Sequence, residues 1–338
     1  MRARWAIALL CAAGLTGAAL YSLQSPYRGF EGDLFLQFPK GSGTRAIAQK
    51  LVDAGVVRYA WQFWLERAIH PHAPLQAGEY KFDQAASVTD VFDRLGRGDV
   101  FYFNFTVPEG SNIFDIARLV ESEGIMSGQD FLKAAEDPTP IKDIAPGAQT
   151  LEGFLFPSTY RVGHFTTAAA LCQMMTGQFR KEWKQLMPDP AADPLKTLTL
   201  ASMIEKETGF AAERPTVASV FQNRLRIGMA LDCDPTVIYA ALLEDRYRGV
   251  IHRSDLDNGH PYNTYRHAGL PPGPIANPGA SSLAAALHPA ESDYLYFVAK
   301  PGGDGHVFSS SLTAHNKAVG NYRHAQSHAQ TKVAHKAR

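Results

Sequence analysis

The sequence predicts an α+β fold preceded by an N-terminal membrane helix. Three observations carry this prediction: an apolar run at the N-terminus, an internal repeat in the first half of the chain, and a C-terminal half that mixes amphipathic helices, turn-rich loops and short strands. We therefore expect two small, related α+β modules between the membrane helix and a C-terminal α+β region.

The N-terminal run extends from Trp5 to Leu23, and its 19 residues approach the roughly 20 that a helix needs to cross a bilayer. Arg2 and Arg4 precede the run, so the short N-terminus should stay in the cytoplasm and the rest should be exported. A cleaved signal peptide is the alternative, because Ala and Gly are frequent in the run. No clear cleavage motif closes it, and we expect residues 1–28 to be an uncleaved transmembrane anchor.

The composition of the chain limits its partners. Lys plus Arg equals Asp plus Glu, at 33 each, which predicts no nucleic-acid partner because such proteins carry a basic face. The three cysteines do not make a disulfide framework; Cys172 and Cys233 could pair, but we expect free thiols. Residues 323–338 contain Arg, Lys and His but no acid, which predicts a disordered basic tail with solvated histidines.

An internal repeat organises the first half. Each copy has an apolar strand, a Pro-x-Gly-Ser turn and a short amphipathic helix that ends at a glycine. In the first copy the strand is 34–38, the turn is Pro39–Ser42 and the glycine is Gly55. In the second copy the strand is 103–107, the turn is Pro108–Ser111 and the glycine is Gly124. An aromatic strand and a further helix follow in each copy. The strand is 78–82 and the helix 88–95 in the first copy, and the strand is 153–160 and the helix 168–179 in the second.

We expect these copies to be two modules, at 29–102 and 103–190, with a proline-rich linker at 181–194 before the C-terminal region. Their Pro-x-Gly-Ser-x-x-x-x-Ile-Ala pattern resembles LysM-type modules, which bind N-acetylglucosamine polymers. The alternative is that the first copy is only a stalk between the membrane and the C-terminal region.

The helix expected at 198–209 carries two carboxyl groups on an otherwise apolar segment. Glu205 and Glu207 are two residues apart, so they point in roughly opposite directions and only one can face a cleft. A lone carboxyl group in apolar surroundings can have its pKa raised by desolvation, as a proton donor to a sugar oxygen requires. The alternative is a solvated pair of glutamates on a surface helix.

The rest of the C-terminal region adds a helix after Glu213, two short strands at 294–298 and 306–308, and turn-rich loops loaded with Asp, Asn, Thr and Tyr. Tyrosine faces can stack on sugar rings, and Asn or Asp can hydrogen-bond hydroxyl and acetamido groups. The loops supply six candidate sugar-binding residues: Asp232, Asp234, Thr236, Asn263, Tyr265 and Asn277.

A series of short motifs in this region identifies a family. They are Glu205-Lys-Glu-Thr208, Glu213-Arg-Pro215, Val217-Ala-Ser-Val-Phe-Gln-Asn-Arg-Leu225, Gly228-Met229, Asp234-Pro-Thr-Val237, Tyr262-Asn-Thr-Tyr265, Gly269-Leu-Pro-Pro-Gly273, Asn277-Pro-Gly279 and His315-Asn-Lys317. In order and spacing they resemble the YceG-like endolytic murein transglycosylases, and the resemblance covers nearly the whole chain after the anchor.

The resemblance implies a catalytic region at 191–322, whose substrate is the glycan strand of peptidoglycan. It implies catalysis by the first glutamate of the Glu-Lys-Glu triplet, here Glu205, with no cofactor and no metal. It further implies a single-pass protein of the cell inner membrane, with its catalytic part outside the cytoplasm and cell-wall synthases as further partners. The family usually has Gln where this chain has Asp232, next to Cys233, so Asp232 could tune the site or only face solvent.

A single carboxyl group suffices for a lytic mechanism. Glu205 would protonate the oxygen that links N-acetylmuramic acid to N-acetylglucosamine, then take the proton from the C6 hydroxyl as it attacks C1, which leaves a 1,6-anhydro end. Glu207 would be structural, paired with Arg214 or Arg224. Two alternatives remain: a muramidase in which Asp232 or Asp234 positions water, and a non-catalytic glycan-binding scaffold that recruits cell-wall synthases.

Overall fold

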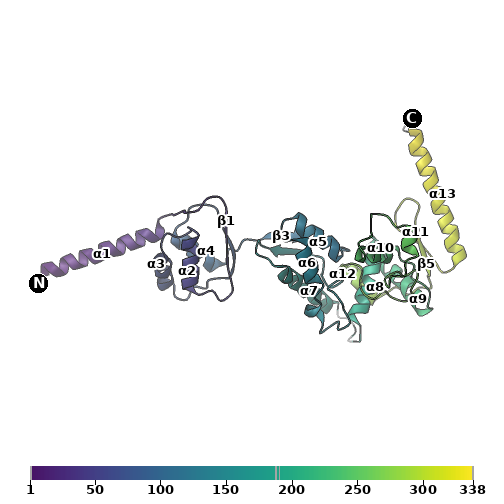
Figure 1. Ribbon diagram of the computed structural model, residues 1–338, viewed down its shortest axis with the longest axis horizontal. Helices are drawn as coiled ribbons and strands as arrows, with labels where there is room; N and C mark the ends of the chain where they lie inside the picture. Colours follow the sequence, from purple (N-terminus) through teal and green to yellow (C-terminus); the bar gives the residue numbers. More distant parts are fainter. Residues whose placement is uncertain (1, 187–188, 190, 337–338) are drawn as a thin grey trace. The chain divides into compact units, whose positions relative to one another are not determined.

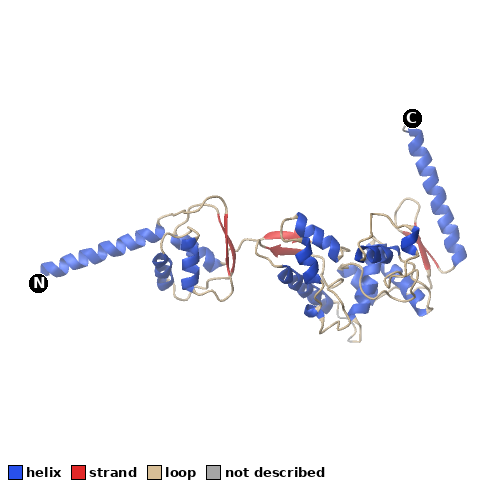
Figure 2. Ribbon diagram, viewed as in Figure 1, coloured by secondary structure: helices blue, strands red, loops and turns tan. Residues whose placement is uncertain are grey.

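The computed structural model describes residues 2–186, 189 and 191–336, and it is a mixed α+β structure in which helices predominate (Figures 1 and 2). The strands among these residues form three two-stranded sheets. The chain divides into two compact units: unit 1 comprises residues 1–104 and 161–165, and unit 2 comprises residues 105–160 and 166–338.

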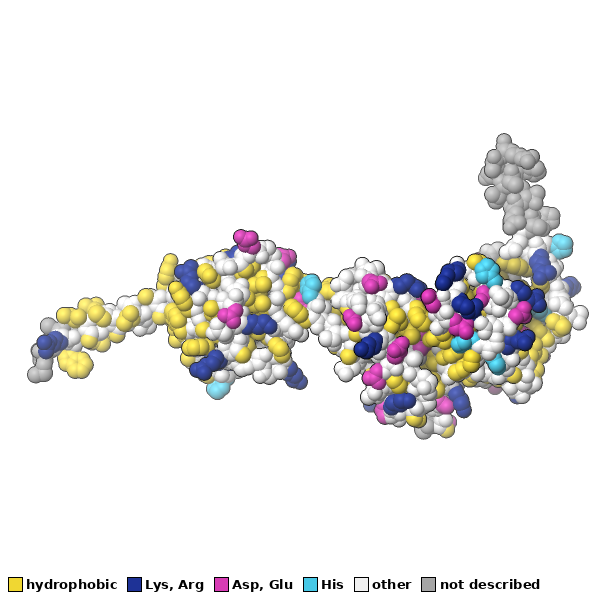
Figure 3. Space-filling model, viewed as in Figure 1, with side chains coloured by type: hydrophobic (Ala, Val, Ile, Leu, Met, Phe, Trp, Pro, Cys, Tyr) yellow, Lys and Arg dark blue, Asp and Glu magenta, His cyan; other side chains and the backbone are white. Residues whose placement is uncertain are grey.

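The N-terminal helix α1 (Arg2–Gln24) belongs to unit 1. Its segment Arg4–Gln24 is long and apolar enough to cross a membrane, and hydrophobic side chains cover its surface (Figure 3). Leu23, near its end, is only 2% exposed because it enters the core of unit 1. The last turn of α1 is therefore part of the folded unit.

The rest of unit 1 builds one small core between a sheet and three helices. Strands β1 (Leu34–Phe38) and β2 (Gly78–Phe82) are antiparallel, with Leu36 opposite Tyr80. Three helices complete the unit: α2 (Thr44–Asp53), α3 (Ala60–Ile69) and α4 (Val88–Arg97). Their apolar faces meet the inner face of the sheet, and the core includes Phe38, Leu51, Phe63, Tyr80, Phe92 and Leu95.

The next segment repeats this order of strand, two helices, strand and helix. Its elements are β3 (Phe103–Thr106), α5 (Ile113–Ser122), α6 (Gly128–Ala135), the 3₁₀ turn η1 (Thr139–Ile141), β4 (Thr159–Val162) and α7 (Ala168–Gln185). Strand β3 pairs with β4. Gly41 and Gly110 occupy left-handed backbone conformations, with φ of 86° and 75°, and Gly55 and Gly124 do the same at 72° and 67°.

Two expectations for this segment were wrong. The strand expected at 153–160 begins only at Thr159, because residues 153–157 form a buried turn in which the Leu155 N–H donates to the Asn277 side chain (2.9 Å). The linker expected from residue 181 starts later, because α7 continues to Gln185. Residues 187, 188 and 190, which belong to that linker, lie outside the described residues.

The C-terminal region belongs to unit 2. Its elements are α8 (Pro194–Glu207), η2 (Ala211–Glu213), α9 (Arg214–Arg226), α10 (Asp234–Leu243), α11 (Arg253–Leu256), α12 (Ala280–Leu287), β5 (Tyr296–Ala299), β6 (His306–Ser309) and α13 (Leu312–Lys336). Helix α8 is central, because both α9 and α12 pack against it. The antiparallel pairing of β5 with β6, which sets Phe297 opposite Phe308, was predicted from the sequence and is confirmed.

Other elements of this region differ from the prediction. The segment expected as a loop around Asp234 begins α10, because Pro235 fits the first turn of a helix. Helix α8 ends at Glu207 instead of continuing to Gly209, and Thr208 is its extended C-cap. The tail expected to be disordered from residue 323 continues α13 to Lys336, since the segment lacks Gly and Pro after Gly320.

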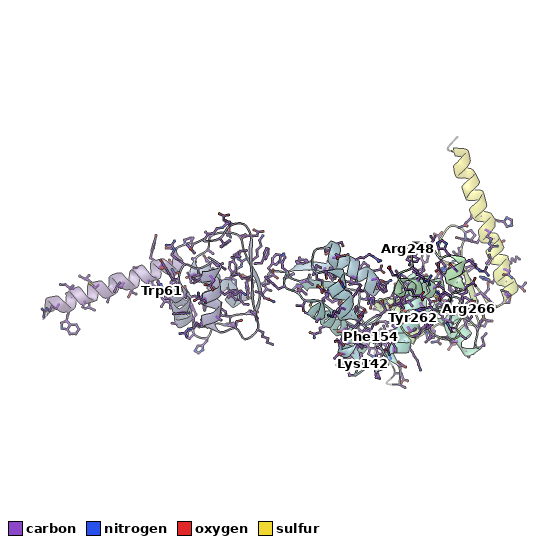
Figure 4. All side chains as sticks on the ribbon, viewed as in Figure 1. Trp61, Lys142, Phe154, Arg248, Tyr262 and Arg266 are labelled. Carbon is purple, nitrogen blue, oxygen red and sulfur yellow. The ribbon has the colours of Figure 1, made fainter. Side chains whose placement is uncertain are left out.

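A buried carboxyl group joins the second strand–helix segment to the C-terminal region within unit 2. Glu152 accepts hydrogen bonds from the Ile113 N–H (3.0 Å), the Tyr239 hydroxyl (3.0 Å) and the Asn277 amide (2.9 Å). Tyr262, labelled in Figure 4, packs its ring 5.1 Å from that of Tyr239. Burial raises the pKa of Glu152 to about 8 even though three donors face it, so this carboxyl group titrates far above its usual range.

The raised pKa of Glu152 predicts a pH-dependent stability. Between about pH 5 and 8 the folded chain holds a proton that the unfolded chain has released, so stability should fall by about 1.4 kcal/mol per pH unit. Glu152→Gln cannot titrate, so the unfolding free energy of the wild type relative to this variant should decline over that range. Urea unfolding across the range measures it. Glu123→Gln, at an exposed position, should keep the wild-type profile. A constant difference between wild type and Glu152→Gln would contradict the assignment.

Candidate active site

A cavity of about 460 Å³ lies beside the C-terminal end of α8 in unit 2. It is formed by α9, the segment before α10, strand β5 and the start of α13. Its lining combines carboxyl groups, aromatic rings and cationic or imidazole side chains: Glu207, Asp232, Asp234, Tyr265, Tyr296, Phe297, Arg224 and His315. Acids beside aromatic faces are the combination expected for a carbohydrate site.

Glu207 is the most buried acid of this cavity. The Cys233 thiol donates to its Oε1 at 3.1 Å, and none of the ion pairs among the described residues involves this carboxyl group. Burial raises its pKa, the nearby charge of Asp234 adds to that effect, and the thiol hydrogen bond opposes it. Glu207 therefore keeps its proton closer to neutral pH than an exposed glutamate does, as a general acid must.

Glu205 lies in different surroundings. Its Oε1 accepts from Arg214 at 2.7 Å and its Oε2 from the Gly279 N–H at 3.0 Å, and the side chains of Glu205 and Arg214 are 6% and 7% exposed. Arg214 also bonds Ser281 and lies 3.7 Å from Glu109. Glu205 does not line the cavity.

The two glutamates thus have the opposite placement to the one expected. The expectation that Glu207 pairs with Arg214 or Arg224 was wrong: Arg214 pairs with Glu205, and Arg224 lies 3.8 Å from Asp232. The physical reason is the rotation of about 200° between two positions two apart on a helix. The side of α8 that carries Glu205 faces α9 and α12, so the cavity receives Glu207.

Three of the six candidate sugar-binding residues line the cavity: Asp232, Asp234 and Tyr265. The Tyr265 hydroxyl donates to Asp234 at 2.6 Å, which fixes both side chains at the start of α10. Asp232 has a φ of 46°, in the left-handed region that few residues other than glycine adopt. That conformation places Asp232 before the buried Cys233, whose thiol reaches Glu207.

The other three candidates do not line the cavity, and their hydrogen bonds stabilise the fold. Thr236 is buried and shares hydrogen bonds with Thr264 and the Cys233 carbonyl. Asn263 donates to three backbone carbonyls of residues 255–258, which closes its own loop. Asn277 bonds Glu152 and Ser111. In each case groups of the protein itself, either nearby backbone or more distant residues, form the hydrogen bonds of the polar side chain.

The cavity residues that the sequence reasoning did not select include Arg224, Tyr296 and His315. Arg224 donates to the carbonyls of Leu231 and Leu295 and lies over the Tyr296 ring, 5.4 Å from its centroid. His315 stacks on the same ring at 5.2 Å, and its buried Nδ1 has no hydrogen-bond partner among the described residues. Burial lowers the pKa of His315, as does the positive charge of Arg224. The His315-Asn-Lys317 motif was the signal that could have found the histidine.

Two further observations concern alternative sites. No group of three His, Cys, Asp or Glu side chains in the described part of the chain is arranged to hold a metal ion. A larger cavity of about 750 Å³ lies between α6, η1 and α7, lined in part by Lys133, Thr176 and Arg180. Its lining has neither an aromatic ring nor a glutamate, so we place the candidate active site at Glu207.

Comparisons with known proteins agree on one family. The model of the YceG-like family matches residues 36–321. The Bacillus subtilis endolytic murein transglycosylase is 35% identical over 306 residues, which cover 85% of this chain and 84% of the relative. The Streptococcus pneumoniae D39 protein of the same name is 28% identical over 320 residues, 83% of this chain but 57% of the relative. A crystal structure of a yceG-like protein from Listeria monocytogenes has 32% identity and a TM-score of 0.55, covering 84% of this chain and 98% of that one.

The buried ion pair predicts a stability role for Glu205. Glu205→Gln removes the negative charge and leaves the Arg214 guanidinium buried without its main partner, so the unfolding free energy should fall by about 3 kcal/mol. Glu109→Gln is the matched control, because this carboxylate is 51% exposed and 3.7 Å from Arg214; its loss should be below about 1 kcal/mol. Urea unfolding of both variants measures the difference, and equal losses would refute the role.

Proposed function

The chain belongs to the YceG-like family, and on that premise we propose that it is an endolytic murein transglycosylase. The enzyme, a carbon–oxygen lyase, cleaves the bond between N-acetylmuramic acid and N-acetylglucosamine within nascent glycan strands. It leaves 1,6-anhydro-N-acetylmuramic acid ends and so terminates glycan polymerisation. One observation supports the assignment on this chain: a half-buried glutamate without an ion-pair partner among the described residues, in an aromatic-lined cavity of the C-terminal region.

We propose Glu207 as the proton donor, in place of the Glu205 that the resemblance implies. Two observations support the reassignment of the proton donor from Glu205 to Glu207. Glu207 lines the cavity and its pKa is raised by burial, whereas Glu205 accepts hydrogen bonds from Arg214 and from the Gly279 N–H. Both carboxylate oxygens of Glu205 are thus taken up by contacts within the protein, whereas Glu207 has no cationic partner among the described residues.

The reaction needs only this one group. Protonated Glu207 donates its proton to the glycosidic oxygen, and the C1–O bond breaks as positive charge builds at C1. The substrate's own acetamido group stabilises that centre. The Glu207 carboxylate then takes the proton of the C6 hydroxyl while the C6 oxygen bonds to C1. The leaving N-acetylglucosamine end keeps the first proton, Glu207 regains one, and no water is consumed.

The neighbours of Glu207 have supporting roles in this proposal. Tyr265 and Tyr296 offer ring faces on which sugars can stack, and Asp232 and Asp234 can accept hydrogen bonds from sugar hydroxyls. The His315 Nδ1, which has no partner among the described residues, is a further group for the substrate. The muramidase alternative would instead use Asp232 to position water, since this side chain is 42% exposed at the cavity.

The first test compares the two glutamates. Glu207→Gln should lower the rate of glycan-strand cleavage by about 10²–10⁴-fold, because the amide cannot transfer a proton. Glu205→Gln should lose activity only in proportion to its loss of folded protein. Cleavage rates of the purified full chain, normalised to the folded fraction from circular dichroism, measure both. A folded but inactive Glu205→Gln beside an active Glu207→Gln would return the assignment to Glu205. If both variants stayed active, neither glutamate would be the proton donor, and a wild-type chain that binds glycan without cleaving it would favour the glycan-binding scaffold.

The second test concerns the product. Intramolecular attack by the C6 hydroxyl benefits from a high effective molarity and should outcompete water. Mass spectrometry of the new glycan ends should therefore show 1,6-anhydro sugars, which lack the mass of one water relative to a hydrolytic product. Reducing N-acetylmuramic acid ends as the main product would establish the muramidase instead. Asp232→Asn would then be the variant expected to abolish cleavage, whereas in the lytic mechanism it should leave the product unchanged.

We further propose that 29–102 and 103–190 are two related LysM-like modules. The shared order of elements and the left-handed glycines of both turns support this. The second turn is engaged within unit 2, since the Gly110 N–H donates to the Asn277 carbonyl at 2.9 Å, whereas Gly41 of the first is exposed. We therefore assign glycan binding to the first module, which titration with N-acetylglucosamine oligomers tests.

We also propose that α1 anchors the chain in the cell inner membrane, with the N-terminus cytoplasmic and residues 191–322, the catalytic region, outside. The length and apolar character of α1 support the anchor, and Arg2 and Arg4 support the orientation. Cell-wall synthases, which make the nascent strands, are the partners that this location suggests. Protease added to spheroplasts should remove the bulk of the chain.

A further inference from the structure

The outer face of α3 in unit 1 is apolar and aromatic although it is exposed. Trp61, Trp64 and Ile69 are 42%, 43% and 48% exposed, and Tyr59, the N-cap of the helix, is 53% exposed. The two charged residues of α3 lie elsewhere, since Glu66 is buried and Arg67 bonds a backbone carbonyl at 2.6 Å. Beyond α1, unit 1 exposes five large hydrophobic side chains, and Tyr102 alone lies away from α3.

This face adjoins the end of the membrane helix. The Gln62 amide donates to the Ser22 carbonyl at 3.0 Å and to the Ser22 hydroxyl at 2.5 Å, so the first turn of α3 is bonded to the last turn of α1. Figure 4 labels Trp61, the neighbour of Gln62, at the junction where α1 meets unit 1. The helix that carries these exposed side chains is thus bonded directly to the end of the anchor.

The length of α1 leaves no spacer between the bilayer and unit 1. The segment Arg4–Gln24 spans about 30 Å as a helix, which equals the thickness of the hydrocarbon core. Leu23 already lies in the core of unit 1. When α1 crosses the membrane, the surface of unit 1 around Ser22 must therefore lie at the level of the lipid headgroups.

We propose that the face formed by Tyr59, Trp61, Trp64 and Ile69 is a membrane-interface surface, seated among lipid headgroups beside the exit of α1. The proposal rests on the proposed anchoring of α1. Tryptophan and tyrosine prefer this zone because the ring is apolar and its N–H or O–H remains hydrated.

The positively charged residues near the aromatic face also fit lipid headgroups as the partner. Arg45 lies over the Trp64 ring, 5.7 Å from its centroid, and the exposed Arg58 precedes Tyr59. Guanidinium groups beside interfacial aromatics can bind lipid phosphates. Two contacts with the bilayer, through α1 and through α3, would stop unit 1 from pivoting about its anchor.

The test uses the full chain reconstituted in vesicles of phosphatidylethanolamine and phosphatidylglycerol. The chain has four tryptophans, and replacing Trp5, Trp64 and Trp183 with Phe leaves Trp61 as the only tryptophan, which is excited apart from the tyrosines at the red edge of the absorption band. Lipids brominated near the headgroup end of the acyl chain should quench Trp61 about twofold more than lipids brominated near the chain end, as expected for an interfacial ring.

Two controls use the same design. A variant that keeps only Trp5 reports whether α1 is inserted. A tryptophan-free chain with Tyr102→Trp reports an exposed position between α4 and β3, and it should not be quenched.

Each outcome decides the proposal. Quenching of Trp5 without quenching of Trp61 overturns it and leaves the anchor intact, which would make the aromatic face a surface for a protein partner. If neither Trp5 nor Trp61 is quenched, the anchoring itself fails. Quenching of Tyr102→Trp as strong as that of Trp61 shows that unit 1 contacts lipid without this specific face, which also overturns the proposal.

Discussion

The buried ion pair between Glu205 and Arg214 is the constraint on which the candidate active site depends. It joins α8 to α9, and through the Gly279 N–H it joins α8 to the start of α12. A helix held on one side by a charged pair cannot rotate about its axis, so the direction of Glu207 is fixed as well. The residue that the sequence marks as catalytic thus orients the residue that faces the cavity.

Two glutamates of one helix turn therefore have opposite electrostatic surroundings. Glu205 has a guanidinium and a backbone N–H as donors. Glu207 has a thiol as its donor and Asp234 as a charged neighbour, in a setting whose burial raises its pKa. One helix turn thus places one carboxyl group in an ion pair and the other in a cavity, where no cation pairs with it among the described residues.

The sequence predicted the order of the elements better than it predicted which side chains line the cavity beside α8. Periodicity found most of the helices and the β5–β6 pair because local spacing determines amphipathic faces. It could not tell Glu205 from Glu207, because spacing says that they diverge but not which side α9 and α12 cover. It also could not separate Asp232, Asp234 and Tyr265 from Asn263 and Asn277, since the same polar residue types either line a cavity or close a loop, depending on which backbone groups lie within reach.

The second Pro-x-Gly-Ser turn shows the same dependence on context. Gly110 and Ser111 exchange backbone hydrogen bonds with Asn277, both at 2.9 Å, and the Asn277 side chain continues to Glu152. The left-handed φ of 75° favours glycine at position 110, and a Cβ there would lie 3.4 Å from the Glu205 side chain, in ordinary van der Waals contact. The turn thus supports α8 directly, so a change in it would reach the ion pair that orients Glu207. In the first copy the same four-residue pattern has no such partner within unit 1, and its turn faces solvent. Identical local sequence signals therefore lead to a scaffold in one copy and an open surface in the other, and only tertiary packing separates them.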